Sequence, residues 1–480
     1  MFHLHDIIHH QHAAKHAANH IDMLHGSLLP KILLFALPLS LSSMLQQAFN
    51  SVDVAVVGKF VSSQAMAAVG GNGPIINLLI NLFVGISVGA NVVIARYIGQ
   101  KADEKVKETV KTSQVLSIIS GFLLMFIGMF AARPMLEAIG TPSDILTLAT
   151  SYLRVYFLGM PAFMFFNFGA AILRSVGDTK RPLISLLFGS ILNAILNCIF
   201  VVAFDWGVYG VAIATVISNY ICAAMVAYWL ATEDEPIRWT FRQLGIERGV
   251  LAQTLQIGIP AGLQGMVFSF SNIFIQAAIN THGSAAVAGS AAAVVYECLA
   301  WLAVSGFTQA AVTFTSQNYG AHHYDRCKKI LVLCSSSSFA LCAVFAGVFV
   351  GAQGFFIELF TDDPSVTHYA STRLIWVLLL EPIAVSYELP GASMRGLGYS
   401  MTPTIITVLG TCAFRLLWIY TVCPIYPSYE ALMVVYPISW VITGVATIIA
   451  YRIVSKKAYR MLPAPAEAAP PCKFLAQHRG

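Results

Sequence analysis

Long apolar runs follow one another between short polar breaks from Lys31 to Arg452. Each run covers the roughly 20 residues that a helix needs to cross the ~30 Å apolar core of a membrane. Several runs exceed that length, so we expect tilted, bent or protruding helices. The predicted spans are 32–58, 66–95, 109–131, 145–173, 182–204, 209–230, 251–281, 285–316, 328–351, 366–394, 403–423 and 431–452.

The second half of the chain repeats the pattern of the first half. The segment 160–182, MPAFMFFNFGAAILRSVGDTKRP, aligns without a gap on 381–403, EPIAVSYELPGASMRGLGYSMTP. The matched pairs are Pro161 and Pro382, Ala171 and Ala392, Arg174 and Arg395, Gly177 and Gly398, and Pro182 and Pro403, each 221 residues apart (382 − 161). We therefore predict an all-α membrane protein whose twelve transmembrane helices form two six-helix bundles related by an internal repeat.

The polar breaks divide the chain into five parts. We predict a His-rich leader at 1–30, a first lobe at 31–230, a linker at 231–248, a second lobe at 249–453 and a disordered tail at 454–480. The linker mixes charged and apolar residues, as a surface-lying segment does. Residues 1–25 hold eight histidines at spacings that could serve a metal-binding tail, but an interfacial amphipathic leader is the simpler interpretation. We predict no metal site.

Composition and charge agree with a membrane protein. The chain is 57% hydrophobic and 11% charged, whereas soluble proteins carry about 25% charged residues. Of its 28 Lys and Arg, 23 fall on one side of the predicted spans, which places both termini in the cytoplasm of a cell with the protein in its plasma or inner membrane. This placement explains the net charge of +5 without nucleic acid as a partner.

An acidic side chain lies within the first predicted span. Asp53 occupies the sequence FNSVDVAVVG, 15 residues after Pro38, which allows the helix to bend. A charge at mid-membrane costs roughly 2.5–3.5 kcal/mol, so its presence suggests a function. The alternative is an aspartate at a helix end that is solvated or bonded to a neighbour. Further polar residues that could share a pocket with it are Asn50, Tyr152, Asn193, Asn197 and Thr215, each of which alone would more often serve helix packing.

The second half carries a different set of charges. Glu297, Glu381, Glu388 and Arg415 all lie within predicted spans. We predict an ion pair between Glu297 and Arg415, which could be purely structural. At least one glutamate is then left for proton or cation handling, with Glu297 and Glu388 as candidates, while Arg373 is expected nearer the outer interface.

These segments resemble the multidrug and toxic compound extrusion (MATE) family of transporters. The resemblance covers about 31–452 and rests on ALPLSLSSMLQQAFNSVDVAVVGKF, on RYIGQKADEKVKE with its echo QNYGAHHYDRCKK, on AAILRSVGDTKRP with GASMRGLGYSMTP, and on WGVYGVAIATVISN. It implies two six-helix lobes beside a cleft that opens to one side at a time. It also implies export of organic cations in exchange for H+ or Na+.

The resemblance also bears on individual residues. Asp53 falls where one branch of the family has an acid, and Tyr152, Asn193 and Thr215 fall where that branch has its polar partners. Asn197 is a departure, because that branch commonly has a second aspartate at this position. The asparagine keeps a carbonyl oxygen able to ligate Na+, so the choice between H+ and Na+ as coupling ion stays open. Another branch of the family has a glutamate where this chain has Phe268 or Ser269. The site that this glutamate forms is therefore not expected in this chain.

Together these features predict a monomeric antiporter that exports amphipathic cationic drugs and contacts membrane lipids. It would need no cofactor beyond the coupling ion, H+ or Na+. The alternative is a lipid-linked oligosaccharide or lipid flippase of the same superfamily, which would need a more basic interior. An enzyme is disfavoured because no HExxH, paired intramembrane aspartates or nucleotide loop is present. A channel is disfavoured because unpaired acids suit ion-coupled switching.

Overall fold

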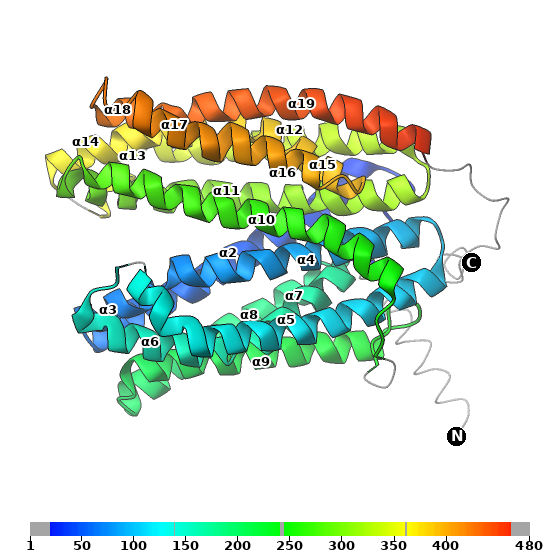
Figure 1. Cartoon of the computed structure of the whole chain (residues 1–480), viewed down its shortest axis with the longest axis horizontal. Coiled ribbons are helices and arrows are strands. Elements are labelled where there is room, and N and C mark those ends of the chain that lie inside the picture. The colour runs from blue at the N-terminus through cyan, green and yellow to red at the C-terminus, as the bar shows by residue number, and fades with distance from the viewer. Residues whose placement is uncertain (1–19, 139, 241–243, 361, 462–480) are drawn as a thin grey trace. The chain divides into compact units, whose positions relative to one another are not determined.

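All regular secondary structure in the described part of the chain is helical (Figure 1). The computed structural model describes residues 20–138, 140–240, 244–360 and 362–461. The helices of the first half are α2 (Leu28–Phe60), α3 (Ser63–Gly70), α4 (Gly73–Gly99), α5 (Asp103–Ala138), α6 (Ser143–Phe157), α7 (Met160–Ser175), α8 (Lys180–Asn197), the π-helix η1 (Cys198–Ala203) and α9 (Gly207–Thr232).

The second half contains more short and irregular helical segments than the first. Its helices are α10 (Arg248–Asn280), α11 (Ser284–Gly320), α12 (Tyr324–Gly351), α13 (Gln353–Glu358), α14 (Pro364–Arg373), η3 (Leu374–Leu378), η4 (Glu381–Ala384), α15 (Val385–Gly396), α16 (Met401–Thr407), η5 (Val408–Ala413), α17 (Phe414–Thr421), α18 (Tyr429–Met433) and α19 (Val435–Met461). Of these, η3 and η5 are π-helical and η4 is a 3-10 helix.

The number of membrane spans agrees with the sequence. Among the described residues, eleven helical stretches are long and apolar enough to cross a membrane. A twelfth span results if α6 and α7, which meet at an angle of 48°, are counted together. The bend follows from the break at Leu158 and Gly159, directly before Pro161 in α7. The prediction of an all-α multi-pass membrane protein is confirmed.

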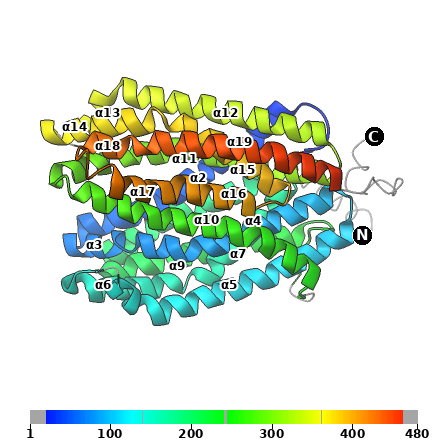
Figure 2. The same ribbon diagram turned by 45° about the horizontal axis from the view of Figure 1, so that its top comes forward.

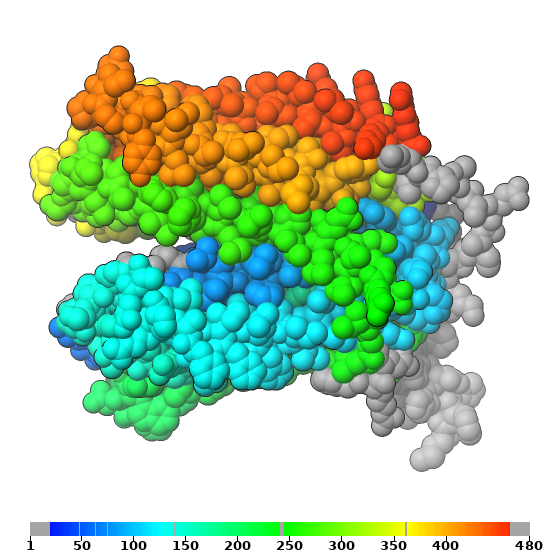
Figure 3. Space-filling model, viewed as in Figure 1, coloured from blue at the N-terminus to red at the C-terminus, as the bar shows by residue number. Residues whose placement is uncertain are grey.

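The outer surface of the helices is apolar, as a lipid environment requires. Helix α5 lies on the surface of the protein (Figure 3). Its residues Phe122, Phe126 and Phe130 are all exposed. The inward side of the same helix carries Gly121, Leu124 and other buried residues. This division indicates that lipid covers the exposed face.

The described helices form two compact units whose limits differ from the predicted lobes. Of the described residues, those in 20–25 and 42–262 form unit 1 and those in 26–41 and 263–461 form unit 2. Within unit 1, α5 packs on α4, α6 and α7, and α8 packs on α9. Within unit 2, α11 packs on α12, α14 and α15, and α15 packs on α19 (Figure 2). The units differ from lobes that begin at 31 and 249, because α2 and α10 each contribute to both units.

The first part of α2 belongs to unit 2 because it packs on α11. Ser40 donates a hydrogen bond of 2.9 Å from Oγ to the carbonyl of Ala303. Phe35 meets Phe314 edge to face, with ring centroids 5.4 Å apart. A Cβ at Gly306 would lie 2.3 Å from the carbonyl oxygen of Ala36, so only glycine permits this approach.

The first part of α10 belongs to unit 1 because glycines bring it against α4. Gly85 and Gly89 on α4 face Gly258 and Gly262 on α10, and each pair of glycines is spaced by four residues. Cβ atoms added at Gly85 and Gly258 would lie 2.2 Å and 2.4 Å from backbone atoms of the opposite helix. Small residues at this spacing let two membrane helices pack backbone to backbone.

The repeated sequence motif forms the same turn in both halves. Gly177 and Gly398 have φ angles of +90° and +93°, a region that favours glycine. In each case the following residue donates from its backbone N–H to a carbonyl five residues earlier, at 3.0 Å for Asp178 and 2.9 Å for Tyr399. The repeat therefore conserves a helix-terminating turn.

A buried cluster of charged side chains lies at the end of unit 1 where α7 is followed by α8. Arg181 forms ion pairs with Asp178 and with Glu233, which follows α9, and all three side chains are nearly inaccessible. His20 lies 3.7 Å from the carboxylate of Glu233. Burial alone would raise the pKa of Glu233, but the hydrogen bond from His20 and the charge of Arg181 lower it to about 2.

The connecting segments depart from prediction at two places, the tail and the linker. Helix α19 continues to Met461, so the disorder predicted from 454 was wrong for 454–461, and 462–480 lie outside the described residues. Six of the leader histidines, His3 to His16, also lie outside them. The linker is anchored rather than only surface-lying, because Trp239 is buried and packs edge-on against Phe165 at 5.1 Å.

We predict that Gly258→Ala destabilises the protein by about 1–3 kcal/mol, because its methyl group would collide with the backbone of α4. Gly347→Ala on α12 is the matched control, since no atom lies within 4 Å of its added Cβ. The control should be neutral or slightly stabilising. Thermal unfolding of the purified variants in detergent measures both, and equal midpoints would contradict the close contact.

We also predict that ionised Glu233 stabilises the fold by up to about 3 kcal/mol at neutral pH. Because its pKa is lowered from 4.5 in the unfolded chain to about 2, this contribution should be complete above pH 4.5 and be lost as the pH falls toward 2. Glu233→Gln should therefore lower the unfolding midpoint at pH 7 and flatten its pH dependence in that window. Exposed Glu358→Gln is the control, and an identical pH profile for both variants would refute the assignment.

Candidate functional site

The aspartate predicted in the first span is buried inside unit 1. Asp53 lies in the second part of α2 and is only 1% exposed. Its carboxylate faces Asn197 at the end of α8 and Thr215 on α9, and both of these side chains are also buried. Asp53 is therefore not solvated, but it is bonded to neighbouring side chains, as the second form of the alternative had it.

Hydrogen bonds join Asp53 and three polar side chains in a closed ring. Asn197 donates from Nδ2 to Oδ1 of Asp53 at 2.8 Å, and Thr215 donates from Oγ1 to Oδ2 at 2.6 Å. Asn197 Nδ2 also donates to Oδ1 of Asn193 at 3.1 Å, and Asn193 Nδ2 donates to Thr215 Oγ1 at 3.2 Å. Both carboxylate oxygens thus accept a hydrogen bond, which offsets part of the cost of burying the charge.

Two oxygen atoms of the ring have hydrogen-bonding capacity that these bonds do not use. Oδ1 of Asn197 is buried and accepts no hydrogen bond from the described residues. Thr215 Oγ1 lies 3.1 Å from the carbonyl oxygen of Val211, so its single proton can point either to Asp53 or to this carbonyl. Asn197 is also the last α-helical residue before η1, and π-helical turns of this kind often occur at functional sites.

The remaining residues predicted for this site lie outside the ring. Tyr152 is buried on α6, and in the described contacts it makes no hydrogen bond to the carboxylate of Asp53. Its ring packs against Tyr156 with a centroid distance of 5.8 Å. Asn50 is exposed and takes no part in the ring. Pro38 lies inside α2, four residues before Ser42, where the part of the helix that belongs to unit 1 begins.

In unit 2 the predicted ion pair is replaced by a different one. Glu297 on α11 binds Arg373 on α14 through two hydrogen bonds, Nε to Oε1 at 2.6 Å and Nη2 to Oε2 at 2.9 Å. Arg373 is 5% exposed, so its side chain is buried inside unit 2. The predicted pair of Glu297 with Arg415 was wrong, because Arg373 already occupies both oxygens of this carboxylate.

Arg415 instead lies between aromatic rings. Its guanidinium carbon is 4.3 Å from the ring centroid of Tyr436 and 5.7 Å from that of Phe268, and its Nε donates to Ser439 at 3.1 Å. The side chain is only 2% exposed. Cation–π contacts stabilise a buried guanidinium, but they do not neutralise its charge.

The other two glutamates of unit 2 have separate surroundings. Glu388 on α15 lies 3.8 Å from Arg395, about two helical turns further along the chain. Arg395 also donates to Gln264 at 2.8 Å. Glu381, at the start of η4, is 5% exposed, and its Oε2 has no hydrogen-bond partner among the described residues. Glu381 is thus the least satisfied carboxylate of unit 2.

The sequence did not lead us to the residues that surround Arg415. Tyr436 and Ser439 lie on α19, and Ser439 is followed at four-residue spacing by Thr443 and Thr447. All three hydroxyls are fully buried, and Thr443 and Thr447 donate to carbonyls one turn earlier at 2.7 Å. A hydroxyl at every turn of an apolar helix is the signal that could have marked this inward face.

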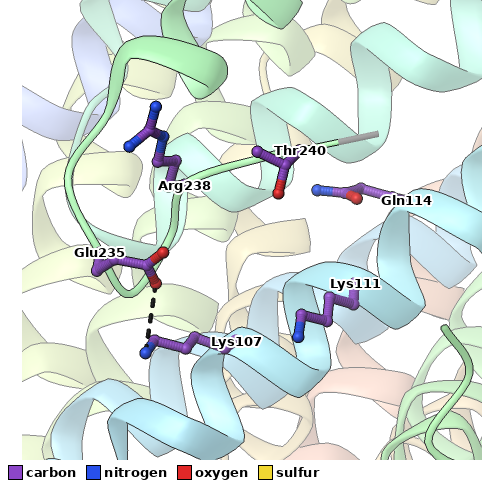
Figure 4. A pocket seen from close by; sticks show the side chains of 6 residues that line it. All are labelled: Lys107, Lys111, Gln114, Glu235, Arg238 and Thr240. Atoms are coloured by element: carbon purple, nitrogen blue, oxygen red, sulfur yellow. Dashed lines mark ion pairs between the residues drawn. The ribbon is translucent and has the colours of Figure 1, made fainter. Parts of the chain in front are cut away.

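A shallow surface pocket lies where α5 meets the linker of unit 1 (Figure 4). Lys107 forms an ion pair of 3.5 Å with Glu235, and Lys111 and Arg238 add positive charge. None of the predicted site residues lines this pocket. It is a basic patch at the end of a helix, distinct from the buried ring.

Known proteins with similar sequences include multidrug exporters. A probable multidrug resistance protein of Bacillus subtilis, YoeA, is 28% identical over 386 residues, which cover 78% of this chain and 82% of YoeA. The multidrug export protein MepA of Staphylococcus saprophyticus is 21% identical over 78% of this chain and 83% of its own length. Among solved structures, a MATE protein in complex with MaL6 superposes with a TM-score of 0.84 at 23% identity over 91% of this chain and 98% of that chain, which shows a shared fold.

The family model agrees with the internal repeat and with the fold. The model described as MatE matches twice, at residues 38–199 and 260–421, and the two matches begin at Pro38 and Pro260. Together they cover more than half of the 480 residues, including Asp53 and Arg415. The chain therefore belongs to the MatE family of multidrug and toxic compound extrusion transporters.

Proposed function

We propose that this transporter is an antiporter that exports amphipathic organic cations in exchange for H+ or Na+, with Asp53 as its coupling carboxylate. The single observation that carries the proposal is the closed hydrogen-bonded ring around a carboxylate that is 1% exposed inside unit 1. An ionisable group within a membrane span is costly unless it serves a function. The names of the similar multidrug exporters support drugs as the cargo.

The ring can take up a proton without losing a hydrogen bond. In the ionised state Thr215 donates to Asp53 and accepts from Asn193. When Asp53 is protonated on Oδ2, the Thr215 hydroxyl can turn to the carbonyl of Val211 and accept from the carboxyl group instead. A hydroxyl has one donor and two acceptor positions, so all of them stay satisfied in this second state.

The same residues also fit Na+ as the coupling ion. Na+ is a hard cation and prefers oxygen ligands such as carboxylates and amide carbonyls. Asp53 supplies the negative charge, and the unpartnered Oδ1 of Asn197 supplies a buried carbonyl oxygen. Because Asn197 replaces a second carboxylate, the site carries one negative charge, which suits a single monovalent ion.

Helix α2 supplies the link between ion binding and transport. Pro38 removes one backbone donor from the helix, which permits a change of bend near this residue. The part of α2 before Ser42 belongs to unit 2, and the part that carries Asp53 belongs to unit 1. Loading of Asp53 would thus act on a helix that both units share, which is a route to the alternating access expected of such transporters.

Asp53→Asn should abolish ion-driven export, because the amide keeps the size of the side chain but cannot exchange a proton or carry the charge. The measurement is ethidium efflux from proteoliposomes under an imposed pH gradient and, separately, an imposed Na+ gradient. We expect efflux in the variant to fall to the rate of protein-free liposomes. Undiminished efflux with either gradient would remove Asp53 from the mechanism, while the response of the wild type to each gradient identifies the ion.

Thr215→Val should reduce ion-driven efflux by about tenfold or more, because it removes a hydrogen bond to a charged group worth roughly 1.5–3 kcal/mol. Thr215→Ser is the matched control, since it keeps the hydroxyl and loses only a methyl group. We expect the serine variant to retain most of the wild-type rate in the same proteoliposome assay. Equal losses in both variants would indicate that Thr215 acts through packing, without a role for the hydroxyl.

A further inference from the structure

The pocket between α5 and the linker of unit 1 has no part in the proposed export function. Figure 4 shows its lining, with three side chains from α5 and three from the linker: Lys107, Lys111, Gln114, Glu235, Arg238 and Thr240. The hollow has a volume of about 250 Å³, whereas sites for drug-sized molecules measure roughly 300–1,000 Å³. The pocket therefore has room for a small polar group and is too small for a drug-sized molecule.

Two positive charges in this pocket have no acidic partner. Lys107 is compensated, because it lies 3.5 Å from the carboxylate of Glu235 and 3.1 Å from that of Glu104. Lys111 and Arg238 form no ion pair within the described part of the chain. The three basic and one acidic lining residues leave a net charge of +2 (3 − 1), which attracts an anion.

A buried hydrogen-bond acceptor also lines this pocket. Gln114 is 3% exposed, and its Oε1 accepts no hydrogen bond from the described residues. Its amide extends toward Thr240 (Figure 4). An unpaired buried polar atom costs about 1–3 kcal/mol, so a hydroxyl donor from a ligand would stabilise it. The lining thus suits a ligand that combines an anionic group with hydroxyl groups.

The helix face that carries the pocket continues into the apolar surface of α5. Ile119, Phe122 and Phe126 follow Lys111 at steps of three and four residues, and all three are exposed. Residues at these steps share one face of a helix, and Ile119 lies about 12 Å from Lys111 along the axis. The acyl chains of membrane lipids cover such an apolar face. A headgroup in the pocket and acyl chains on α5 can therefore belong to one molecule.

The internal repeat indicates that the charge of Lys111 is specific to unit 1. Lys111 corresponds to Val332 on α12, 221 residues later (332 − 111), and Val332 is 65% exposed. Lys107, in contrast, corresponds to Lys328. The general enrichment of basic residues at one end of membrane helices explains Lys107 and Lys328. It does not require a second lysine one turn further along α5.

We propose that this pocket is a binding site for the headgroup of an anionic phospholipid of the surrounding membrane. Lys111 and Arg238 attract the phosphate, and a headgroup hydroxyl donates to Oε1 of Gln114. The acyl chains lie along the exposed face of α5. Basic pockets at the ends of membrane helices are suited to phospholipid headgroups. Phosphatidylglycerol fits this description, because it has an anionic phosphodiester and a glycerol headgroup with free hydroxyls. The bound lipid is neither the exported compound nor the coupling ion.

The test measures phospholipid binding to the purified, delipidated full-length protein by native mass spectrometry. Phosphatidylglycerol and phosphatidylcholine with the same acyl chains are titrated separately, and we expect phosphatidylglycerol to bind at least about tenfold more tightly. Soluble glycerophosphoglycerol carries the same phosphodiester and hydroxyls without acyl chains. It should bind at least about tenfold more weakly than the lipid, because it cannot cover the apolar face of α5.

Removal of the two uncompensated charges should abolish the preference. In the double variant Lys111→Gln and Arg238→Gln, we expect affinities for the two lipids within about twofold of each other, because glutamine carries no charge. The control double variant, Lys329→Gln and Lys457→Gln, removes the same charge from exposed positions on α12 and α19 and should keep the wild-type preference within about twofold. Arg238 is exposed, so Arg238→Gln alone decides if the pocket double variant fails to fold, with a loss of about threefold.

A further variant tests the hydroxyl contact. Gln114→Met removes the acceptor oxygen at nearly constant side-chain length, so it should weaken phosphatidylglycerol binding about threefold. Phosphatidylcholine has no headgroup hydroxyl, and its affinity should change by less than about twofold. Equal changes for both lipids would contradict the contact with Gln114.

Three results would overturn the inference as a whole. The first is equal binding of phosphatidylglycerol and phosphatidylcholine to the wild type. The second is the same loss of preference in the pocket variant and in the control double variant, which would indicate a general attraction of anionic lipids to basic surfaces. The third is binding of glycerophosphoglycerol as tight as that of the lipid, which would identify a site for a free phosphodiester from solution.

Discussion

Charges and backbone groups within a membrane must find their partners inside the protein, and the rest of this structure follows from that constraint. Helices satisfy the backbone groups, which explains why every described regular element is helical. The ionisable side chains need more specific arrangements. Asp53 accepts hydrogen bonds from Asn197 and Thr215, while Glu297 binds Arg373, so each carboxylate is compensated by residues from a different helix.

The same constraint makes close helix packing depend on small residues. Lipid is as apolar as the helix surfaces, so apolar contact alone does not hold two helices together. The glycines of α4 and α10 allow backbone contact, and Gly306 lets α2 approach α11. These contacts decide that α2 and α10 each contribute to both units. A polypeptide segment shared in this way is well placed to respond to a change at Asp53.

Much of the fold was predictable from the sequence, and the pairing of its side chains was not. Apolar runs and the repeat of Arg174 and Gly177 as Arg395 and Gly398 predict the helices and their duplication, because both depend on local sequence. The pairing of Glu297 with Arg373 depends on how two distant helices pack, which no local pattern records. The boundary within α2 escaped prediction for the same reason. The polar residues within the spans suggested a pocket that Asn193, Asn197 and Thr215 share with Asp53, but no local pattern shows which of their atoms form hydrogen bonds.

The duplicated glycine turns have a consequence for how the two halves diverged. At Gly177 and Gly398 the repeat preserves a backbone conformation, with φ angles of +90° and +93°, while the charges around it differ. The turn needs only glycine, so selection on it leaves neighbouring side chains free to change. After an ancestral gene doubled, one copy could therefore specialise in a carboxylate held by amides and a hydroxyl, and the other in arginines among aromatic rings. The two halves share a scaffold and differ in the buried charges that it holds.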